Sequence, residues 1–159
     1  MFYLPLQYLY LYNKLCVMKK MERKLNLFLF YKLPSAFWCG VRVQSITSTT
    51  CAVRVKHSWI NQNPFKSMYF AVQAMAAELS TGALVIMKIK ESKKPISMLV
   101  AQNKSVFTKK ATGKITFSCF DGSNIDNAIQ KTLQTGEGQT FWMQSIGVNE
   151  QGQQVAIFD

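Results

Sequence analysis

Glu78 is the residue of this chain whose surroundings point most directly to chemistry. It lies in the stretch 61–82, NQNPFKSMYFAVQAMAAELSTG, which reads as a helix of almost only apolar and small residues. A helix that is apolar nearly all round is expected to be buried. A carboxylate in an apolar setting has a raised pKa and is a better general base near neutral pH. The pattern therefore predicts a buried helix whose carboxylate either acts in catalysis or is held by polar partners.

Small residues surround Glu78 at helical spacing. Ala71, Ala74 and Gly82 stand at i−7, i−4 and i+4, and Thr81 stands at i+3. These positions share one face of a helix. Small side chains there leave room for a bound ligand, and equally for a packed helix or sheet. We take Ala74, Thr81 and Gly82 as candidate substrate-binding residues.

Other catalytic arrangements find little support in the sequence. The cysteines, Cys16, Cys39, Cys51 and Cys119, form no C-x-x-C pair, and His57 is the single histidine. This argues against a zinc or other metal site. Nothing ties the one histidine to a particular serine or cysteine, so no nucleophilic triad is predicted. Free thiols are typical of a reducing compartment, which favours a cytoplasmic location.

The formal charge of +11, from 19 Lys and Arg against 8 Asp and Glu, invites a nucleic-acid interpretation. Only three of the basic residues are arginine, most lysines are scattered, and no nucleic-acid-binding motif is present. We therefore expect no nucleic-acid partner. A basic rim that attracts an anionic ligand is the better explanation. Lys109 and Lys110, in the turn-like TKKATG, either meet a phosphate of such a ligand or form a solvated turn.

The first 20 residues differ from the rest of the chain in their pattern of apolar residues. Their apolar run is broken by Pro5, Gln7 and Asn13, and it lacks the cleavage site of a signal peptide. We expect residues 1–20 to be a poorly ordered extension outside the fold, with a membrane-surface anchor as the alternative and no stable membrane insertion. Residues 21–159 are then a single domain.

Hydrophobic periodicity and turn residues divide that domain into strands and helices. Asn63 is the expected N-cap of the long helix, with Pro64 at its first position, and Ser123 is the expected N-cap of a second helix. The turn NEQG joins the last two strands. The predicted elements are a helix at 21–31, strands at 41–46 and 51–57, the long helix from 63 to at least 79, strands at 96–107 and 114–120, a helix at 123–133, and strands at 140–148 and 153–158. Successive hairpins imply an antiparallel sheet, and one long apolar helix needs a curved sheet to wrap it.

This α+β order, with the motifs KLPSAFWCGVRV and NPFKSMYFAVQAMAAELSTG, resembles the hot-dog fold of the acyl-CoA thioesterase superfamily. The likeness covers residue 24 to the C-terminus and is greatest to an uncharacterised branch, a domain-of-unknown-function group. The hot-dog fold is a curved antiparallel sheet around one long central helix. In phenylacetate-pathway thioesterases of this fold, an Asn precedes a His-Gly-Gly at the helix start, and an acid follows nine residues after the His.

On this chain Asn63 matches that Asn, Glu78 matches the acid, and Tyr69, Phe70 and Ala71 replace His-Gly-Gly. The resemblance implies thioester hydrolysis with Glu78 as the general base. Phe70 and Ala71 would supply oxyanion-binding amides, while Asn63 and Tyr69 orient the thioester. Tyrosine is a poor base at neutral pH, so the replacement of the His leaves activity to be tested.

The resemblance also implies an acyl-CoA or acyl-carrier thioester as substrate, with an acyl chain between helix and sheet. Coenzyme A would enter only as part of the substrate, and no separate cofactor is expected. The assembly implied is a homodimer or a tetramer, with sites at the subunit interface. The alternative is a non-catalytic protein that binds acyl-CoA, acyl carrier or fatty-acyl ligands.

Overall fold

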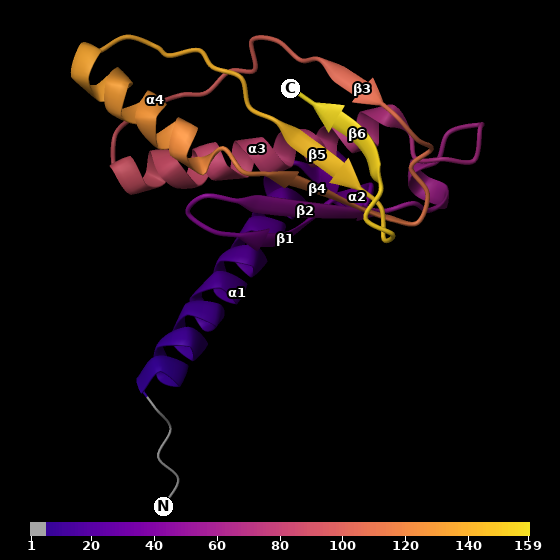
Figure 1. Ribbon diagram of the computed structural model, residues 1–159, viewed down its shortest axis with the longest axis horizontal. Helices are drawn as coiled ribbons and strands as arrows, with labels where there is room; N and C mark the ends of the chain where they lie inside the picture. The colour runs from indigo at the N-terminus through magenta and orange to yellow at the C-terminus, as the bar shows by residue number, and fades with distance from the viewer. Residues whose placement is uncertain (1–5) are drawn as a thin grey trace, which may run out of the picture.

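The computed structural model describes residues 6–159 of the chain, and the side chains from residue 19 onward (Figure 1). After two N-terminal helices the order is two strands, a long helix, two strands, a shorter helix and two strands, as the sequence predicts. The elements are α1 (Leu6–Lys32), α2 (Pro34–Trp38), β1 (Arg42–Ile46), β2 (Cys51–Lys56), the 3-10 turn η1 (Trp59–Asn61), α3 (Phe70–Ser92), β3 (Ser105–Phe107), β4 (Lys114–Cys119), α4 (Gly122–Thr135), β5 (Ser145–Val148) and β6 (Gln154–Phe158).

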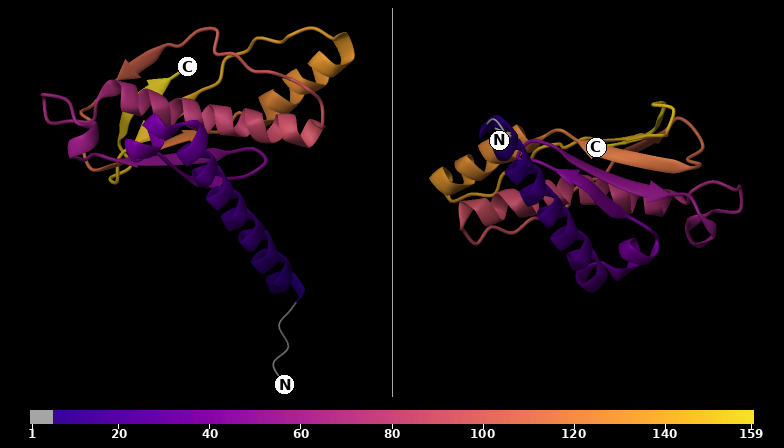
Figure 2. Two further views of the ribbon diagram at one scale, coloured as in Figure 1. Left: turned by 180° about the vertical axis from the view of Figure 1, so that it is seen from behind. Right: turned by 90° about the horizontal axis from the view of Figure 1, so that it is seen from below.

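One antiparallel sheet carries the fold, with its strands in the order β1-β2-β4-β5-β6-β3. Helix α3 lies along one face of this twisted sheet and contacts four of its strands, β1, β2, β4 and β5 (Figure 2). The predicted α+β class, with an antiparallel sheet around one central helix, is confirmed.

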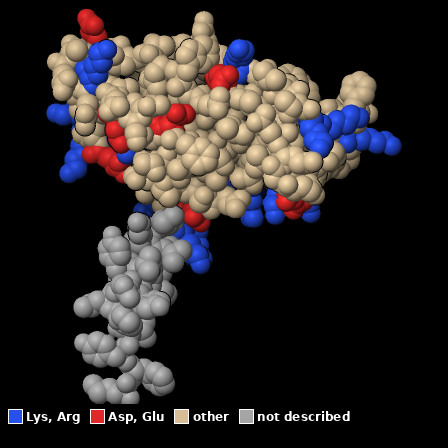
Figure 3. Space-filling model, viewed as in Figure 1, with Lys and Arg blue, Asp and Glu red and all other residues tan. Residues whose placement is uncertain are grey.

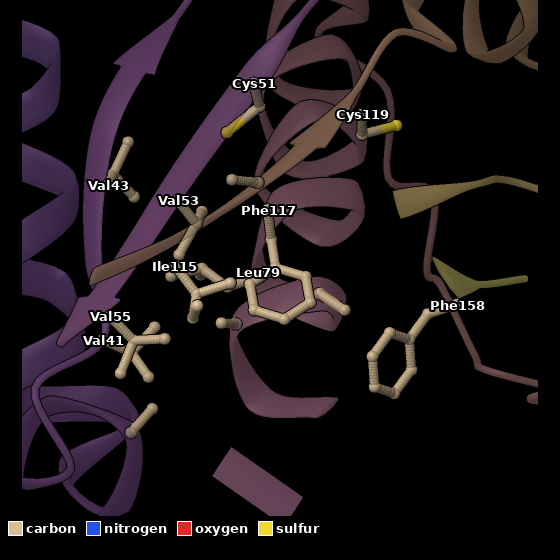
Figure 4. Close-up of a cluster of buried hydrophobic side chains, with 14 of the residues drawn as sticks. Val41, Val43, Cys51, Val53, Val55, Leu79, Ile115, Phe117, Cys119 and Phe158 are labelled. Atoms are coloured by element: carbon tan, nitrogen blue, oxygen red, sulfur yellow. The ribbon is translucent and has the colours of Figure 1, made fainter. Parts of the chain in front are cut away.

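The core lies between the sheet and the side of α3 that faces it. Buried and more exposed residues alternate along β2 and β4, and Val53 pairs with Phe117 across the two strands. Figure 4 shows these two side chains and Leu79 of α3 in the same apolar cluster. Within the described residues α3 is the one helix long and apolar enough to cross a membrane. Its packing against the strands explains that composition, because a core helix is apolar for the same reason.

Helix α3 begins at Phe70, and the prediction that Asn63 caps it is wrong. The Asn63 side chain instead accepts hydrogen bonds from the backbone amides of Phe65 (2.9 Å) and Ser67 (3.3 Å). These bonds close a turn in which Lys66 has a positive φ of 57°. Asparagine favours such turns because its short side chain competes with helical hydrogen bonding. The chain is therefore still irregular where the sequence places the first helical turn.

Two predicted strands are much shorter than expected. The segment 96–104 is irregular before β3 starts at Ser105, and 140–144 is irregular before β5 starts at Ser145. Both irregular segments line a cavity beside α3, so their apolar residues are used there instead of in the sheet. Helix α4 begins at Gly122 with Asp121 as its N-cap residue, so the predicted cap at Ser123 is also wrong.

Helix α1 starts at Leu6, earlier than the predicted start at Met21, and its first turns extend away from the sheet (Figure 1). Its last turns are fixed to β1. The Asn26 side chain donates to the carbonyl of Val43 (3.0 Å) and accepts from the amide of Val43 (2.9 Å), and Leu29 is fully buried. Residues 1–5 lie outside the described part of the chain. That residues 1–20 are outside the domain stays a prediction.

We expect Gly122→Ala to destabilise the protein, because a Cβ at Gly122 would lie 2.4 Å from Cα of Thr49. Backbone atoms of the β1–β2 turn would have to move, and overpacking of this kind costs roughly 1–3 kcal/mol. Chemical denaturation measures the loss. Gly138→Ala is the control, since a Cβ there meets no atom within 4 Å. Equal stability of the two variants would contradict the tight approach of α4 to the turn.

Candidate active site

A cavity of about 640 Å³ lies beside α3. It is bounded by α3, α4 and two irregular segments, with only two residues from the strands, so it differs from the predicted position between helix and sheet. The lining residues are Ala77, Glu78, Thr81, Gly82, Val85 and Ile89 of α3, Ile125, Ala128, Ile129 and Thr132 of α4, the segments 96–103 and 138–143, and Ser145, Phe158 and Asp159. Most of these side chains are apolar, which suits an acyl chain.

Glu78 faces this cavity together with Thr81 and Gly82. A Cβ on Gly82 would lie 3.6 Å from Glu78 Oε1 and 3.6 Å from the terminal methyl of Met98. The absence of a side chain at Gly82 therefore leaves space beside the carboxylate. In the part of the chain whose side chains are described, the Glu78 carboxylate has no hydrogen bond or ion pair. A carboxylate without a partner is available to a ligand or to a water molecule.

The sequence predicts a buried Glu78, and in the single chain its side chain is exposed. The reason is that this side of α3 fronts the open cavity and not the sheet. The apolar wall on the protein side still withdraws the carboxylate from water, and this partial burial raises the pKa of Glu78. A carboxylate with a raised pKa remains a usable base and is better matched to neutral pH.

The other predicted catalytic residues lie at the N-terminal end of α3. Tyr69 is the residue before the helix, and its ring packs edge-on against that of Phe70 at 4.9 Å between centroids. The amides of Phe70 and Ala71 donate no hydrogen bond to the described residues, whereas the next two amides bond to the Tyr69 carbonyl. The helix thus starts with two free donors, at the positive end of its dipole.

Lys109 and Lys110 lie at the same end. The amide of Met68 donates to the carbonyl of Ala111 (2.9 Å), which brings the lysine turn beside the start of α3. Lys109 Nζ donates to Gln153 Oε1 (2.6 Å), and Lys110 Nζ lies 3.4 Å from the carbonyl oxygen of Phe65. Both lysines are exposed. Figure 3 shows basic side chains gathered at this end of the molecule, so an anion near the α3 start meets a positive field.

The predicted site residues therefore form two groups on one chain. Glu78, Thr81 and Gly82 line the cavity, whereas Asn63, Tyr69, Phe70, Ala71, Lys109 and Lys110 lie at the helix start. Ala74 is half-buried between the groups and packs against the core. At 1.5 Å rise per residue, Tyr69 and Glu78 are separated by about 13 Å along the helix. One chain cannot bring both to a single carbonyl group.

The sequence does not identify Asn61 as a structural centre. Its side chain is buried, and its Nδ2 donates to the carbonyls of Cys39 (2.9 Å) and Lys56 (2.9 Å). Its Oδ1 accepts from the amide of Ser58 (2.9 Å), and its carbonyl accepts from the amide of Tyr69 (2.8 Å). Asn61 thus fixes the start of α3. In the sequence, Asn61 is an asparagine two residues before the predicted N-cap. Asparagine is common in turns, so its position alone does not indicate this role.

The sequence also does not predict that α4 forms one wall of the cavity. Buried Lys88 of α3 donates to Asp126 Oδ2 of α4 at 2.7 Å, and this ion pair fastens α4 beside the cavity. Ile125 and Ile129 then face the cavity from α4. Their spacing predicts one apolar helix face, but nothing in the sequence says that this face meets a ligand space. Phe141 and Trp142 line the cavity too.

The described residues offer no metal site, and the two buried thiols are poor nucleophiles. No group of three or more His, Cys, Asp or Glu residues there could hold a metal ion. Burial raises the pKa of Cys51 to about 12 and that of Cys119 to about 11. Both remain thiols at neutral pH and are unsuited to act as nucleophiles.

Comparison with solved structures gives the class of fold. The Pseudomonas aeruginosa protein PA5026, described as a probable thioesterase, is 21% identical over 86% of this chain and 90% of its own, with a TM-score of 0.72. The Escherichia coli PaaI protein, from the phenylacetic acid degradation operon, is 12% identical over 87% of this chain and 95% of its own, with a TM-score of 0.56. Thioesterase PA1618 of P. aeruginosa, as a mutant, is 10% identical over 86% of this chain and 88% of its own, with a TM-score of 0.58.

These are hot-dog proteins, and the chain described here has the hot-dog fold, as the resemblance predicts. More particularly, residues 23–156 match the family model described as a domain of unknown function, DUF4442, and the chain belongs to that family. No curated protein matches the sequence closely enough to count as a relative.

Glu78→Gln is expected to raise the melting temperature slightly at neutral pH, on the order of 1–3 °C. Because the folded-state pKa of Glu78 is raised, ionisation opposes folding above that pKa, and this penalty disappears as pH falls toward the ordinary glutamate value. The gain should therefore shrink on acidification. Calorimetry over a pH series measures it. A loss of stability at neutral pH would instead identify Glu78 as a carboxylate held by structural partners.

Proposed function

We propose that this protein hydrolyses acyl thioesters, with acyl-CoA or an acyl carrier as the substrate and Glu78 as the general base. The observation that carries the proposal is the Glu78 carboxylate, which has no partner among the described side chains and faces a largely apolar cavity. The raised pKa supports a role as base. The thioesterases among proteins of the same fold support the reaction class.

In the proposed reaction Glu78 takes a proton from water while the water oxygen attacks the thioester carbonyl carbon. The carbonyl oxygen becomes an oxyanion, and the free amides of Phe70 and Ala71 donate hydrogen bonds to it. The C–S bond then breaks, and Glu78 returns its proton to the leaving thiolate. The products are a carboxylic acid and a free thiol. The Tyr69 hydroxyl and the Asn63 amide orient the thioester from the helix start.

This chemistry needs two copies of the chain, because Glu78 and the free amides of one copy are too far apart. The edge of the sheet offers a place for a second copy. β3 is an edge strand whose residues are all exposed, Val106 at 46% and Phe107 at 44% among them. An exposed apolar edge strand is a template for pairing. We propose a homodimer formed there in which Glu78 of one copy acts with the helix start of the other.

The exposed lysines at the helix start fit the same scheme. Lys109 and Lys110 lie beside the proposed oxyanion-binding amides and would meet the phosphate groups of coenzyme A or of a carrier. The acyl chain would extend from that point along Thr81, Gly82 and the apolar side chains of the cavity. The lysines thus serve the charged half of the substrate, and the cavity serves its apolar half.

A non-catalytic acyl-binding protein is the second candidate. The aromatic side chains at the start of α3 favour it, since the exposed Tyr69 and Phe70 rings stand where thioesterases of the phenylacetate pathway have His-Gly-Gly. They narrow the approach to the free amides. The protein would then bind an acyl chain in the cavity without cleaving the thioester.

An assay of purified protein with acyl-CoAs of increasing chain length, following thiol release, tests the first candidate. Turnover that increases with chain length until the cavity is filled supports hydrolysis. Mass spectrometry of ligands extracted from the same protein tests the second. Bound acyl ligands without thiol release on any acyl-CoA or acyl carrier would favour the binding protein and overturn hydrolysis.

A further inference from the structure

The junction of α1 and α2 carries a row of four packed aromatic rings. Phe30, Tyr31 and Trp38 are exposed, and Phe37 is partly buried against the core. The rings of Phe30 and Tyr31 pack edge-on at 5.0 Å, Phe30 and Phe37 at 5.1 Å, and Phe37 and Trp38 at 5.9 Å between centroids. Tyr31 is 69% exposed and Trp38 63% exposed. We call Phe30, Tyr31, Phe37 and Trp38 the aromatic ridge. Such a contiguous apolar surface marks an interaction site.

Apolar side chains of the last turns of α1, and of Leu33 directly after it, extend the ridge. Leu27 is 58% exposed, and Phe28 and Leu33 are partly exposed. The opposite side of these turns is used inside the protein, since Leu29 is buried and Asn26 is bonded to β1. The exposed apolar residues are therefore not needed to hold α1 on the sheet.

Positive charge surrounds the ridge. From residue 19 to residue 42 the chain has six basic residues and a single acidic one, Glu22. Lys20, Lys24 and Lys32 are exposed, and Lys24 lies one helical turn before Leu27 and Phe28. Aromatic residues with interleaved lysines are typical of surfaces that lie at the boundary between lipid and water.

We propose that the aromatic ridge and its lysines dock this protein on the surface of an anionic lipid membrane. The ridge would enter the headgroup region, where Trp and Tyr are favoured, and the lysines would meet lipid phosphates. A second copy of the chain is a poorer occupant, because it would bring one cluster of cations against another. The proposal is independent of hydrolysis. It describes attachment to a surface and not a span.

Flotation of the full-length protein with phosphatidylcholine vesicles, with and without phosphatidylglycerol, tests the proposal. Binding is expected only to the anionic vesicles and should fall as salt increases. Lys24→Gln with Lys32→Gln should weaken binding about fivefold for each cation lost. Tyr31→Ser with Trp38→Ser should weaken it at least tenfold. Circular dichroism of each variant establishes that it is folded.

Matched controls lie elsewhere on the protein. Trp59→Ser with Phe65→Ser removes two aromatics that are 84% and 74% exposed on the β2–α3 loop. Lys90→Gln with Lys94→Gln removes two exposed lysines near the end of α3. Both control variants should bind as the wild type does. Equal losses in the controls would overturn the proposal, as would absence of binding to anionic vesicles.

A fluorescence measurement gives a second readout. With Trp59→Phe and Trp142→Phe, Trp38 is the single remaining tryptophan of the chain. Its emission should shift to shorter wavelength on addition of anionic vesicles. An unchanged spectrum, together with a change in oligomer size when Tyr31 and Trp38 are replaced, would show that a second copy covers the ridge and that the proposal is wrong.

Discussion

Glu78→Gln should lower kcat for acyl-CoA hydrolysis by at least 100-fold. Glutamine keeps the shape of the side chain but cannot accept the proton of the attacking water. Loss of a positioned general base typically costs 10²–10⁴ in rate. Because burial raises the pKa of Glu78, the wild-type rate should fall on acidification at a pH above the ordinary glutamate pKa. The variant should lack that acidic limb. Steady-state kinetics over a pH series measures both effects.

Glu91→Gln is the matched control for this experiment. Glu91 is exposed near the end of the same helix and does not line the cavity. Its replacement changes the net charge in the same way and should leave kcat within a factor of two. Equal turnover by Glu78→Gln and the wild type would remove Glu78 from the mechanism. Since the two variants differ only in position on α3, a loss confined to position 78 locates the base.

Phe117→Ala should give the largest loss of stability, about 3–5 kcal/mol in the free energy of unfolding. Phe117 is fully buried on β4, and its ring packs against that of Phe158 at 5.9 Å between centroids. Across the strand pair it stands opposite Gly147, where a Cβ would lie 2.6 Å from the ring. The ring thus fills the space above a glycine, and alanine at 117 would leave a cavity that neither strand can close.

Phe120→Ala controls for the loss of an aromatic side chain from the same part of the chain. Phe120 directly follows β4, but its side chain is 66% exposed. Its replacement should change stability by less than about 0.5 kcal/mol. Urea unfolding followed by circular dichroism measures both variants. A small loss for Phe117→Ala, similar to that of Phe120→Ala, would contradict the tight packing between β4 and β5.

The fold could be predicted because its signals are local. Alternation marks β2 and β4, apolar composition marks α3, and the turn after Asn149 marks the last hairpin. The start of α3 could not be predicted, since the turn at Asn63 is decided by a competition between a cap and a side-chain turn. The short β3 could not be predicted either. Segment 96–104 has strand-like composition, and only the neighbouring cavity determines where its side chains go.

The sequence predicts which residues form the candidate site, but it does not predict how they are arranged in space. Glu78 stands out because it is the one carboxylate in the apolar stretch 61–82, and spacing alone points to Thr81 and Gly82. Its exposure could not be predicted, because periodicity does not say which side of a helix faces a sheet and which faces open space. The distance between Tyr69 and Glu78 follows from the rise per residue of a helix.

Asn61 anchors the start of α3 without occupying the first amides of the helix. Helices commonly anchor their first turn with a capping side chain, and that cap uses up the amides it anchors. Here the anchor acts one step earlier, through the backbone of Tyr69, and the amides of Phe70 and Ala71 stay unoccupied. Asn61 thus fixes the helix start, whereas Phe70 and Ala71 supply the free hydrogen-bond donors. Substitutions at positions 69–71 can change the side chains beside these amides while the anchor at Asn61 stays in place.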